Sequence, residues 1–335
     1  MLLTKTPYRV SFFGGGTDYP DWYREHGGMV IATTINKYVR LSVRHLPPFF
    51  PHKHKVVYSK VETVSEVSEI SHPAVRAVLT WMKWQTGLDL HYDGDLPARS
   101  GMGSSSAFTV GLIHCLHALQ GKMIPKRALA KASIHIEQEV LKENVGCQDQ
   151  VCASYGGFNC IEFHKDGGFS VSPIVAEPTR LAQLESSLTL VFTSMFRNSS
   201  EVAGVQLQGL AKKTSTMHRM REFVDEAIQI LSSPTTPISD FGKLLHESWA
   251  LKKSLSPLVS NEKIDRIYDD AMRAGAVGGK VLGAGGGGFM LCFVPPERML
   301  QFRGKLKGLI HVPIRFESLG SHVAIYQPDD LELAA

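Results

Sequence analysis

The sequence has few cysteines and no long hydrophobic run. Its five cysteines form no CxxC pair and no even-numbered framework, so we expect reduced thiols and no structural zinc. No stretch reaches the roughly 18 apolar residues that a membrane-spanning helix needs. The first ten residues also lack the apolar core of a signal peptide. We therefore expect a cytoplasmic protein without a membrane partner.

Charge of one sign is not in large excess either. Lys plus Arg number 36 and Asp plus Glu number 32, which leaves a formal charge of +4. This balance does not require nucleic acid as a partner, and no basic stripe with interleaved aromatic residues supports an RNA-binding module. It suits a protein that handles small anionic ligands.

The length and composition predict two domains. The chain has 335 residues, of which 43% are hydrophobic, enough for more than one core. Ile174–Glu185 mixes prolines with polar residues, so we place the boundary there, between domains of residues 1–178 and 179–335.

Hydrophobic periodicity predicts a mixed α+β chain. The expected strands are Tyr8–Phe13, Tyr38–Val43, Leu88–Tyr92, Leu188–Phe192, Phe289–Val294 and His322–Tyr326. The expected helices are Ser71–Gln85, a stretch through Val110–Leu119, Lys126–Glu143, Val202–Leu231, Phe241–Trp249 and Ile264–Ala274. No internal repeat is present, which excludes a solenoid.

The strongest chemical signal is LPARSGMGSSSA, residues 96–107, in which two glycines and three serines precede an apolar helix. Gly101 and Gly103 allow the backbone to approach a ligand, and Ser104 can cap the helix. The free N–H groups of the first turn then attract an anion, and a serine hydroxyl can ligate magnesium. An ordinary capped helix is an equally good interpretation of this turn taken alone. A Walker motif is excluded, because no lysine precedes the hydroxyl residue.

A second glycine cluster, LGAGGGGFMLCFV, occupies residues 282–294. Gly283, Gly285 and Gly288 formally satisfy GxGxxG. A dinucleotide fingerprint must open a helix, whereas Phe289–Val294 has the pattern of a strand and no acidic ribose partner follows. This context disfavours a nicotinamide cofactor.

Acidic residues follow two further turns. In PYRVSFFGGGTDYP, residues 7–20, Arg9 lies on a strand that enters three glycines, followed by Thr17 and Asp18. Asp18 can accept two sugar hydroxyls, or can equally be the Asx residue of a turn. Glu137 lies on a helix and Asp149 near the turn that follows it. One of these could hold magnesium and the other could orient the attacking hydroxyl. Taken alone, however, Glu137 is more typical of a solvated carboxylate on the surface of a helix.

Taken in order, PYRVSFFGGGTDYP, GMGSSSA, GCQDQ and KVLGAGGGG resemble the three motifs and the acidic turn of the GHMP kinases. The resemblance covers nearly the whole chain. It implies an α+β fold of two domains, ribosomal-protein-like at the N-terminus and ferredoxin-like at the C-terminus, with the active site in the cleft between them. It also implies ATP and Mg²⁺ as cofactors, and a monomer or homodimer.

The same resemblance implies roles for individual residues. Asp149 would act as base or hydroxyl orienter, with Arg9 as the cation beside it. Ser105 and Glu137 would ligate magnesium. The acceptor would be held by Gly16, Thr17 and Asp18. The ATP phosphates would be bound by Pro97, Arg99, Gly101, Met102, Gly103, Ser104, Ser105 and Ser106, with Gly285 and Gly286 of the third motif close to them.

Finer features point to a branch of the family. GGGTDYP resembles the sugar kinases, and the wider pattern with GCQDQ and FTSMFRNSSEVA resembles D-glycero-D-manno-heptose 7-phosphate kinases. This implies transfer of phosphate from ATP to the anomeric hydroxyl of a small sugar phosphate. The three glycines, Gly14–Gly16, stand where galactokinases carry a Glu-His pair, which disfavours galactose. A fucose or hexose kinase and a non-catalytic sugar sensor on the same scaffold remain alternatives.

Two ligand contacts are less well defined by the sequence. Arg197 is our candidate for the cation that binds the distal phosphate of the acceptor, because arginine suits phosphate geometry. A surface arginine is an equally good interpretation. The apolar residues Leu79, Trp81, Met82 and Trp84 could line an adenine pocket, although such residues on a helix more often belong to the core.

Overall fold

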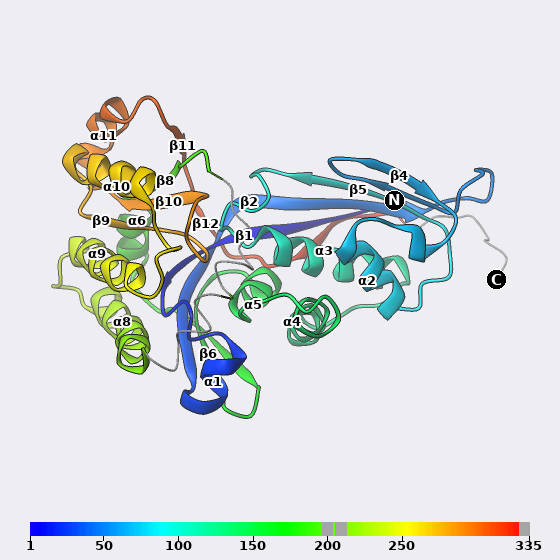
Figure 1. Ribbon diagram of the computed structural model, residues 1–335, viewed down its shortest axis with the longest axis horizontal. Helices are drawn as coiled ribbons and strands as arrows, with labels where there is room; N and C mark the ends of the chain where they lie inside the picture. The colour runs from blue at the N-terminus through cyan, green and yellow to red at the C-terminus, as the bar shows by residue number, and fades with distance from the viewer. Residues whose placement is uncertain (196–203, 205–212, 328–335) are drawn as a thin grey trace.

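The chain is built around two β-sheets, as the computed structural model shows for residues 1–195, Gly204 and 213–327 (Figure 1). One sheet has nine strands and carries most of the N-terminal half. The other has four strands and lies with its helices at the opposite end of the molecule. The predicted α+β class is confirmed.

The larger sheet is organised by its first two strands, β1 (Leu2–Phe13) and β2 (Gly28–His45), which pair antiparallel along nearly the whole of β1. Its main order is β13-β1-β2-β5-β3-β4, in which β13 is His322–Tyr326, and β6 and β7 extend it from the first part of β2. The bounds of the added strands are β3 (His54–Val57), β4 (Val61–Val64), β5 (Leu88–Gly94), β6 (Phe158–Phe163) and β7 (Phe169–Pro173).

Helices cover one face of this sheet (Figure 1). The central one, α3, packs directly on β1 and β2, where a Cβ at Gly111 would lie only 2.8 Å from Thr6 Oγ1. Because glycine has no Cβ, it permits this close approach of helix and sheet. The N-terminal helices are α1 (Pro20–His26), α2 (Pro73–Trp81), α3 (Ser104–Leu119), α4 (Lys126–His135) and α5 (Gln148–Tyr155).

The smaller sheet is antiparallel with the order β11-β8-β10-β9. Its strands are β8 (Leu188–Phe192), β9 (Gly278–Val281), β10 (Phe289–Phe293) and β11 (Ile310–Val312). The helices around it are α6 (Pro178–Ser186), α8 (Thr214–Ser232), α9 (Ser239–Lys253), α10 (Glu262–Ala274) and α11 (Met299–Lys305). Asn261 is the N-cap of α10, because its Oδ1 accepts the N–H of Ile264 at 3.1 Å.

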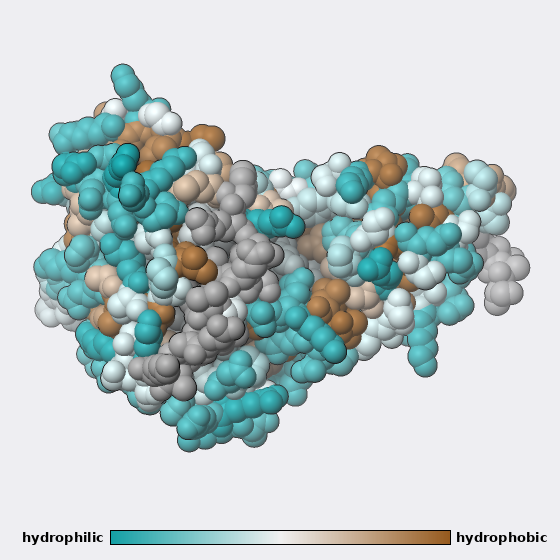
Figure 2. All heavy atoms as spheres, in the orientation of Figure 1, coloured by the Kyte–Doolittle hydropathy of each residue, from teal (hydrophilic) through white to brown (hydrophobic). Residues whose placement is uncertain are grey.

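Aromatic side chains join the two parts of the molecule. Phe12 and Phe13, at the end of β1, contact Phe241 of α9 with ring centroids 5.3 and 5.1 Å apart. All three rings are fully buried. The face drawn in Figure 2 is largely hydrophilic, with hydrophobic residues in separate groups. The largest buried cluster thus contains residues of both sheets, while a second cluster, with Trp249, Met290 and Phe302, belongs to the smaller sheet and its helices.

The end of the described chain returns to the larger sheet. β12 (Phe316–Glu317) pairs with β2, and β13 (His322–Tyr326) pairs with β1. The predicted division into residues 1–178 and 179–335 stays a prediction. β12 and β13 fall within the second range, but they pair with strands of the first. A hydrophobic pattern predicts that a strand forms and does not say which sheet it joins.

Several predicted elements have different bounds. The helix expected at Lys126–Glu143 is α4 followed by a π-helical turn, Ile136–Val140. The helix expected at Ser71–Gln85 is shorter at both ends. It begins at Pro73 after the cap by His72, and it ends at Trp81, shortly before Lys83 adopts a left-handed φ of 52°. Of the helix expected at Val202–Leu231, residues 202–203 and 205–212 lie outside the described part. No helix of the described part is long and apolar enough to cross a membrane.

Candidate active site

A cavity of about 700 Å³ opens where the two parts of the molecule meet. Ten of the residues predicted from the sequence line it: Arg9, Gly16, Asp18, Arg99, Gly101, Gly103, Ser104, Ser105, Ser106 and Asp149. Six others do not line it: Thr17, Pro97, Met102, Glu137, Gly285 and Gly286. Arg197 lies outside the described residues. Lys252, Lys280 and Gly283 also line the cavity, so segments from both parts of the chain meet around it.

The predicted phosphate loop ends at the first turn of α3. Gly103 occupies the N-cap position with φ 73°, in the left-handed region that favours glycine, and no side chain caps the helix. The expectation that Ser104 caps this helix is wrong, because Ser104 is the first helical residue. The N–H groups of the first turn are thus left without a side-chain cap, at the positive end of the helix dipole beside the cavity.

The third glycine motif packs against this loop. A Cβ at Gly101 would lie 2.4 Å from the carbonyl oxygen of Leu282, and a Cβ at Gly283 would lie 2.7 Å from the Cα of Gly101. Gly283 and Ala284 line the cavity, whereas Gly286 turns away and donates its N–H to Val259 O at 2.8 Å. Two glycines therefore let two backbone segments touch, which fixes the shape of the loop.

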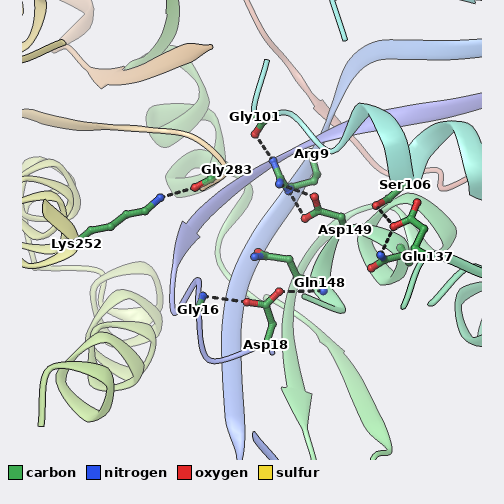
Figure 3. A network of polar contacts seen from close by, with 11 residues as sticks. Arg9, Gly16, Asp18, Gly101, Ser106, Glu137, Gln148, Asp149, Lys252 and Gly283 are labelled. Atoms are coloured by element: carbon green, nitrogen blue, oxygen red, sulfur yellow. Dashed lines mark hydrogen bonds and ion pairs between the residues drawn. The ribbon is translucent and has the colours of Figure 1, made fainter. Parts of the chain in front are cut away.

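Arg9 and Asp149, which both line the cavity, form a bidentate ion pair (Figure 3). Arg9 Nε donates to Asp149 Oδ1 and Nη2 donates to Oδ2, both at 2.7 Å, while Nη1 donates to Gly101 O at 2.6 Å. Arg9 is 4% exposed. A planar guanidinium held on three sides fixes the carboxylate beside the phosphate loop.

Asp18 is a buried carboxylate next to this pair. Its Oδ1 accepts the N–H of Gly16 at 2.9 Å and its Oδ2 accepts the N–H of Gln148 at 3.3 Å (Figure 3). Burial and then the charge of Asp149 raise the pKa of Asp18, against the lowering effect of these two bonds. Thr17 shapes the turn instead of lining the cavity, because its hydroxyl donates to Gly14 O at 2.8 Å.

Glu137 lies fully buried behind the phosphate loop. Its Oε2 accepts a hydrogen bond from Ser106 Oγ at 2.8 Å and another from Gln150 Nε2 (Figure 3). Its Oε1 has no partner among the described residues. Burial raises the pKa of Glu137 to about 7, although the hydrogen bonds to Ser106 and other neighbours lower it. The hydroxyl that contacts Glu137 is that of Ser106, while Ser105 is exposed on the cavity wall.

A magnesium ion suits this corner of the site. Carboxylate and hydroxyl oxygens are ligands that Mg²⁺ prefers. Glu137 Oε1 is such an oxygen, and it accepts no hydrogen bond among the described residues. Glu143, which also lines the cavity, has its pKa raised by burial. The residues present therefore fit the predicted metal, and the assignment of Ser105 and Glu137 as its ligands stays a prediction.

One part of the cavity wall is aromatic. Its lining there includes Tyr58, His72, Tyr92 and Phe108, with the rings of His72 and Phe108 stacked at a centroid distance of 4.8 Å. None of the residues considered for an adenine pocket from the sequence lines the cavity: Leu79, Trp81, Met82 and Trp84. Sequence periodicity missed this aromatic group because its members come from separate elements and share no spacing.

Sequence reasoning also missed two lysines. Lys252 of α9 and Lys280 of β9 are buried, at 7% and 3% exposed, and both line the cavity. Lys280 is the first residue of the KVLGAGGGG motif, and its place in that motif could have identified it as a site residue. Lys252 carried no signal, because a lysine at the end of a helix is ordinarily solvated.

Comparison with known proteins agrees with this geometry. The family model for the GHMP kinases N terminal domain matches residues 69–157, and that for the GHMP kinases C terminal matches residues 224–307. A D-glycero-alpha-D-manno-heptose 7-phosphate kinase of Campylobacter jejuni is 31% identical over 316 residues, which cover 89% of this chain and 90% of that protein. The chain belongs to the GHMP kinase family. As a GHMP kinase it is a phosphotransferase that uses ATP as donor, which confirms the predicted enzyme class.

Solved structures of other GHMP kinases share the fold. The crystal structure of a D-glycero-D-manno-heptose 1-phosphate kinase from Bacteroides thetaiotaomicron superposes with a TM-score of 0.80 at 22% identity, covering 98% of this chain and 100% of that one. Galactokinase from Lactococcus lactis, complexed with galactose, gives a TM-score of 0.74 at 18% identity, covering 96% and 94%. The predicted two-domain GHMP kinase fold is confirmed.

Proposed function

We propose that this GHMP kinase transfers the γ-phosphate of ATP to the anomeric hydroxyl of D-glycero-D-manno-heptose 7-phosphate, giving the 1,7-bisphosphate. One observation carries the proposal: the buried Asp18 and the Arg9–Asp149 pair face the same cavity as the helix end at Gly103. The carboxylate proposed to bind the sugar and the one proposed to act on its hydroxyl thus lie beside the helix end proposed to bind phosphate. The similarity to the Campylobacter jejuni enzyme supports the choice of acceptor.

In the proposed reaction, the anomeric oxygen attacks the γ-phosphorus while the bond from that phosphorus to the oxygen of ADP breaks. The hydroxyl proton passes to Asp149, whose two oxygens retain lone pairs beyond those used by Arg9. Asp18 accepts other sugar hydroxyls and so orients the ring. Because phosphoryl transfer has a loose transition state, positioning and charge neutralisation supply most of the rate.

The nucleotide would occupy the rest of the cavity. The uncapped N–H groups at the start of α3 would bind its phosphates, and the aromatic group of Tyr58, His72, Tyr92 and Phe108 would contact the base. Glu137, with Ser105 or Ser106, would hold the Mg²⁺. When bound, the ion neutralises charge on the β- and γ-phosphates.

Phosphorus NMR of the reaction mixture tests the proposal directly. Incubation of the protein with ATP, magnesium and heptose 7-phosphate should give ADP and a new anomeric phosphate that is coupled to the C1 proton. A new phosphate ester at another carbon, or no consumption of ATP, would contradict it. Denatured protein is the control for phosphate exchange without enzyme.

Two alternatives are separated by the acceptor. A fucose or hexose kinase would release ADP with the unphosphorylated sugar and not with the 7-phosphate. A non-catalytic sugar sensor would bind a sugar and release no ADP with any acceptor. The bidentate Arg9–Asp149 pair and the buried Glu137 favour a catalytic site.

A further inference from the structure

Two buried lysines face the cavity from the C-terminal part of the molecule. Lys252 reaches from α9 toward Gly283, on the side of Arg9 away from Glu137 (Figure 3). Lys280 comes from β9 and lines the same cavity. Neither residue belongs to the set that the proposed reaction uses.

The partners of these ammonium groups are neutral. Lys252 Nζ donates to the carbonyl oxygens of Gly283 and Val281, and Lys280 Nζ donates to Phe12 O at 2.7 Å. An ammonium group has three N–H donors. Within the described residues, one donor of Lys252 and two of Lys280 therefore have no acceptor, and neither lysine forms an ion pair.

Burial and nearby positive charges disfavour the charged form of both lysines. Burial, followed by the positive charge of Arg9, lowers the pKa of Lys252 to about 8, while the charge of Asp18 raises it. Burial and the charges of Lys252 and Arg9 lower the pKa of Lys280 as well. A buried cation without a counter-ion carries an unfavourable desolvation free energy. A ligand that brings negative charge to this place would offset that free energy on binding.

The position of the pair points to the acceptor end of the cavity. Phe12, which accepts the bond from Lys280, is the second-last residue of β1, shortly before the turn that carries Asp18, and the charge of Asp18 acts on Lys252. For the phosphates of ATP, the start of α3 and the proposed magnesium ligands already supply contacts. We propose that Lys252 and Lys280 form a subsite for the phosphate group that the acceptor carries before the reaction. This rests on the proposed sugar phosphate kinase function.

Equilibrium binding tests the subsite without relying on turnover. Lys252→Met and Lys280→Met keep the length of the side chain and remove its charge. The matched control is Lys253→Met, because Lys253 is the next residue of α9 and pairs with Asp265 at 3.1 Å. The probes for calorimetry are heptose 7-phosphate, the unphosphorylated heptose, and inorganic phosphate, each with the ATP site filled by a non-hydrolysable analogue and magnesium.

We expect each variant to bind heptose 7-phosphate about 10–100-fold more weakly than the wild type, as the loss of a charge-assisted contact predicts. Affinities for the unphosphorylated heptose and for the nucleotide should change less than about twofold. Thermal unfolding should be unchanged or shifted upward, because an uncompensated buried charge is removed. A solely structural role for the lysines would instead lower the unfolding temperature and leave ligand affinity intact.

Other outcomes would overturn the inference. Equal loss of nucleotide affinity would assign the lysines to the phosphates of ATP. Unchanged binding of heptose 7-phosphate, or wild-type protein that binds no inorganic phosphate with the ATP site filled, would remove the subsite. Failure of the proposed function is distinct: wild type would then bind phosphate through these lysines but form no anomeric phosphate from heptose 7-phosphate.

Discussion

Arg9 holds both carboxylate oxygens of Asp149, through hydrogen bonds of 2.7 Å from Nε and from Nη2. The same guanidinium donates to the carbonyl of Gly101 in the phosphate loop. One side chain therefore links the carboxylate proposed to act on the acceptor to the loop proposed to bind the donor. A change in either partner should alter catalysis more than it alters the fold.

Asp149→Asn should keep ATP binding and lose turnover. The amide retains an oxygen that can accept from Arg9, but it cannot take the proton of the attacking hydroxyl. We expect kcat to fall about 10²-fold or more, because general-base catalysis contributes about 10²–10⁴-fold. A coupled ADP assay and nucleotide calorimetry measure the two effects. Asp21→Asn, in the exposed first turn of α1, is the control, and near-normal turnover of Asp149→Asn would remove Asp149 from the mechanism.

Arg9→Lys preserves the charge and removes the geometry. A lysine has one nitrogen and cannot span both oxygens of Asp149 while also contacting Gly101. Hydrogen bonds to charged groups contribute about 1.5–3 kcal/mol each, so kcat/KM should fall about tenfold or more. Steady-state kinetics measure this. Arg24→Lys on the exposed part of α1 should leave the kinetics unchanged, and equal activity of the two variants would contradict the positioning role of Arg9.

Gly146→Ala should displace Asp18. A Cβ at position 146 would lie 1.9 Å from Asp18 Oδ2, and that carboxylate is buried and held by two backbone N–H groups. We expect the KM for the sugar to rise about tenfold or more, since a small misplacement of a positioning group is costly, with little change in the KM for ATP. Gly304→Ala, where an added Cβ meets nothing within 4 Å, is the control. An unchanged sugar KM would show that Asp18 does not bind the acceptor.

Glu137→Gln should change the pH dependence of stability. The pKa of Glu137 is raised from 4.5 to about 7, so between these values the folded protein holds more protons than the unfolded chain. The free energy of unfolding therefore contains a contribution that is complete below pH 4.5 and is lost as pH rises toward 7. Without magnesium, the variant should lose less stability than wild type between pH 5 and about 8. Chemical denaturation across this range measures it, with Glu139→Gln as the exposed control.

The same carboxyl should make magnesium binding dependent on pH. A metal ligand must be deprotonated, so the affinity of the nucleotide-loaded protein for Mg²⁺ should rise by up to about tenfold per pH unit below pH 7 and level off above it. Glu137→Gln should abolish most of this dependence. Titration calorimetry at several pH values measures the affinity. The same pH profile in wild type and variant would exclude Glu137 as the ligand.

Elements with strong local signals were predicted well. Leu188–Phe192 and His322–Tyr326 have the predicted bounds, because a short apolar or alternating run between turns is a local property of a strand. The helix through Lys126 was predicted too long, since periodicity does not distinguish an α-helix from the π-helical turn that ends it at Val140. The partners of β12 and β13 could not be predicted, because pairing with β1 and β2 depends on contacts across almost the whole sequence.

By itself the sequence determined the chemistry available to this protein. Its glycines, serines and carboxylates, in their order, pointed to a GHMP kinase, because backbone freedom and oxygen ligands are properties of residue types and short turns. Only the tertiary structure decided which of them meet. It paired Glu137 with Ser106, closed Gly101 against Gly283, and brought Lys252 and Lys280 to the cavity. Those contacts follow from how helices and sheets pack, and packing joins residues that no local pattern relates.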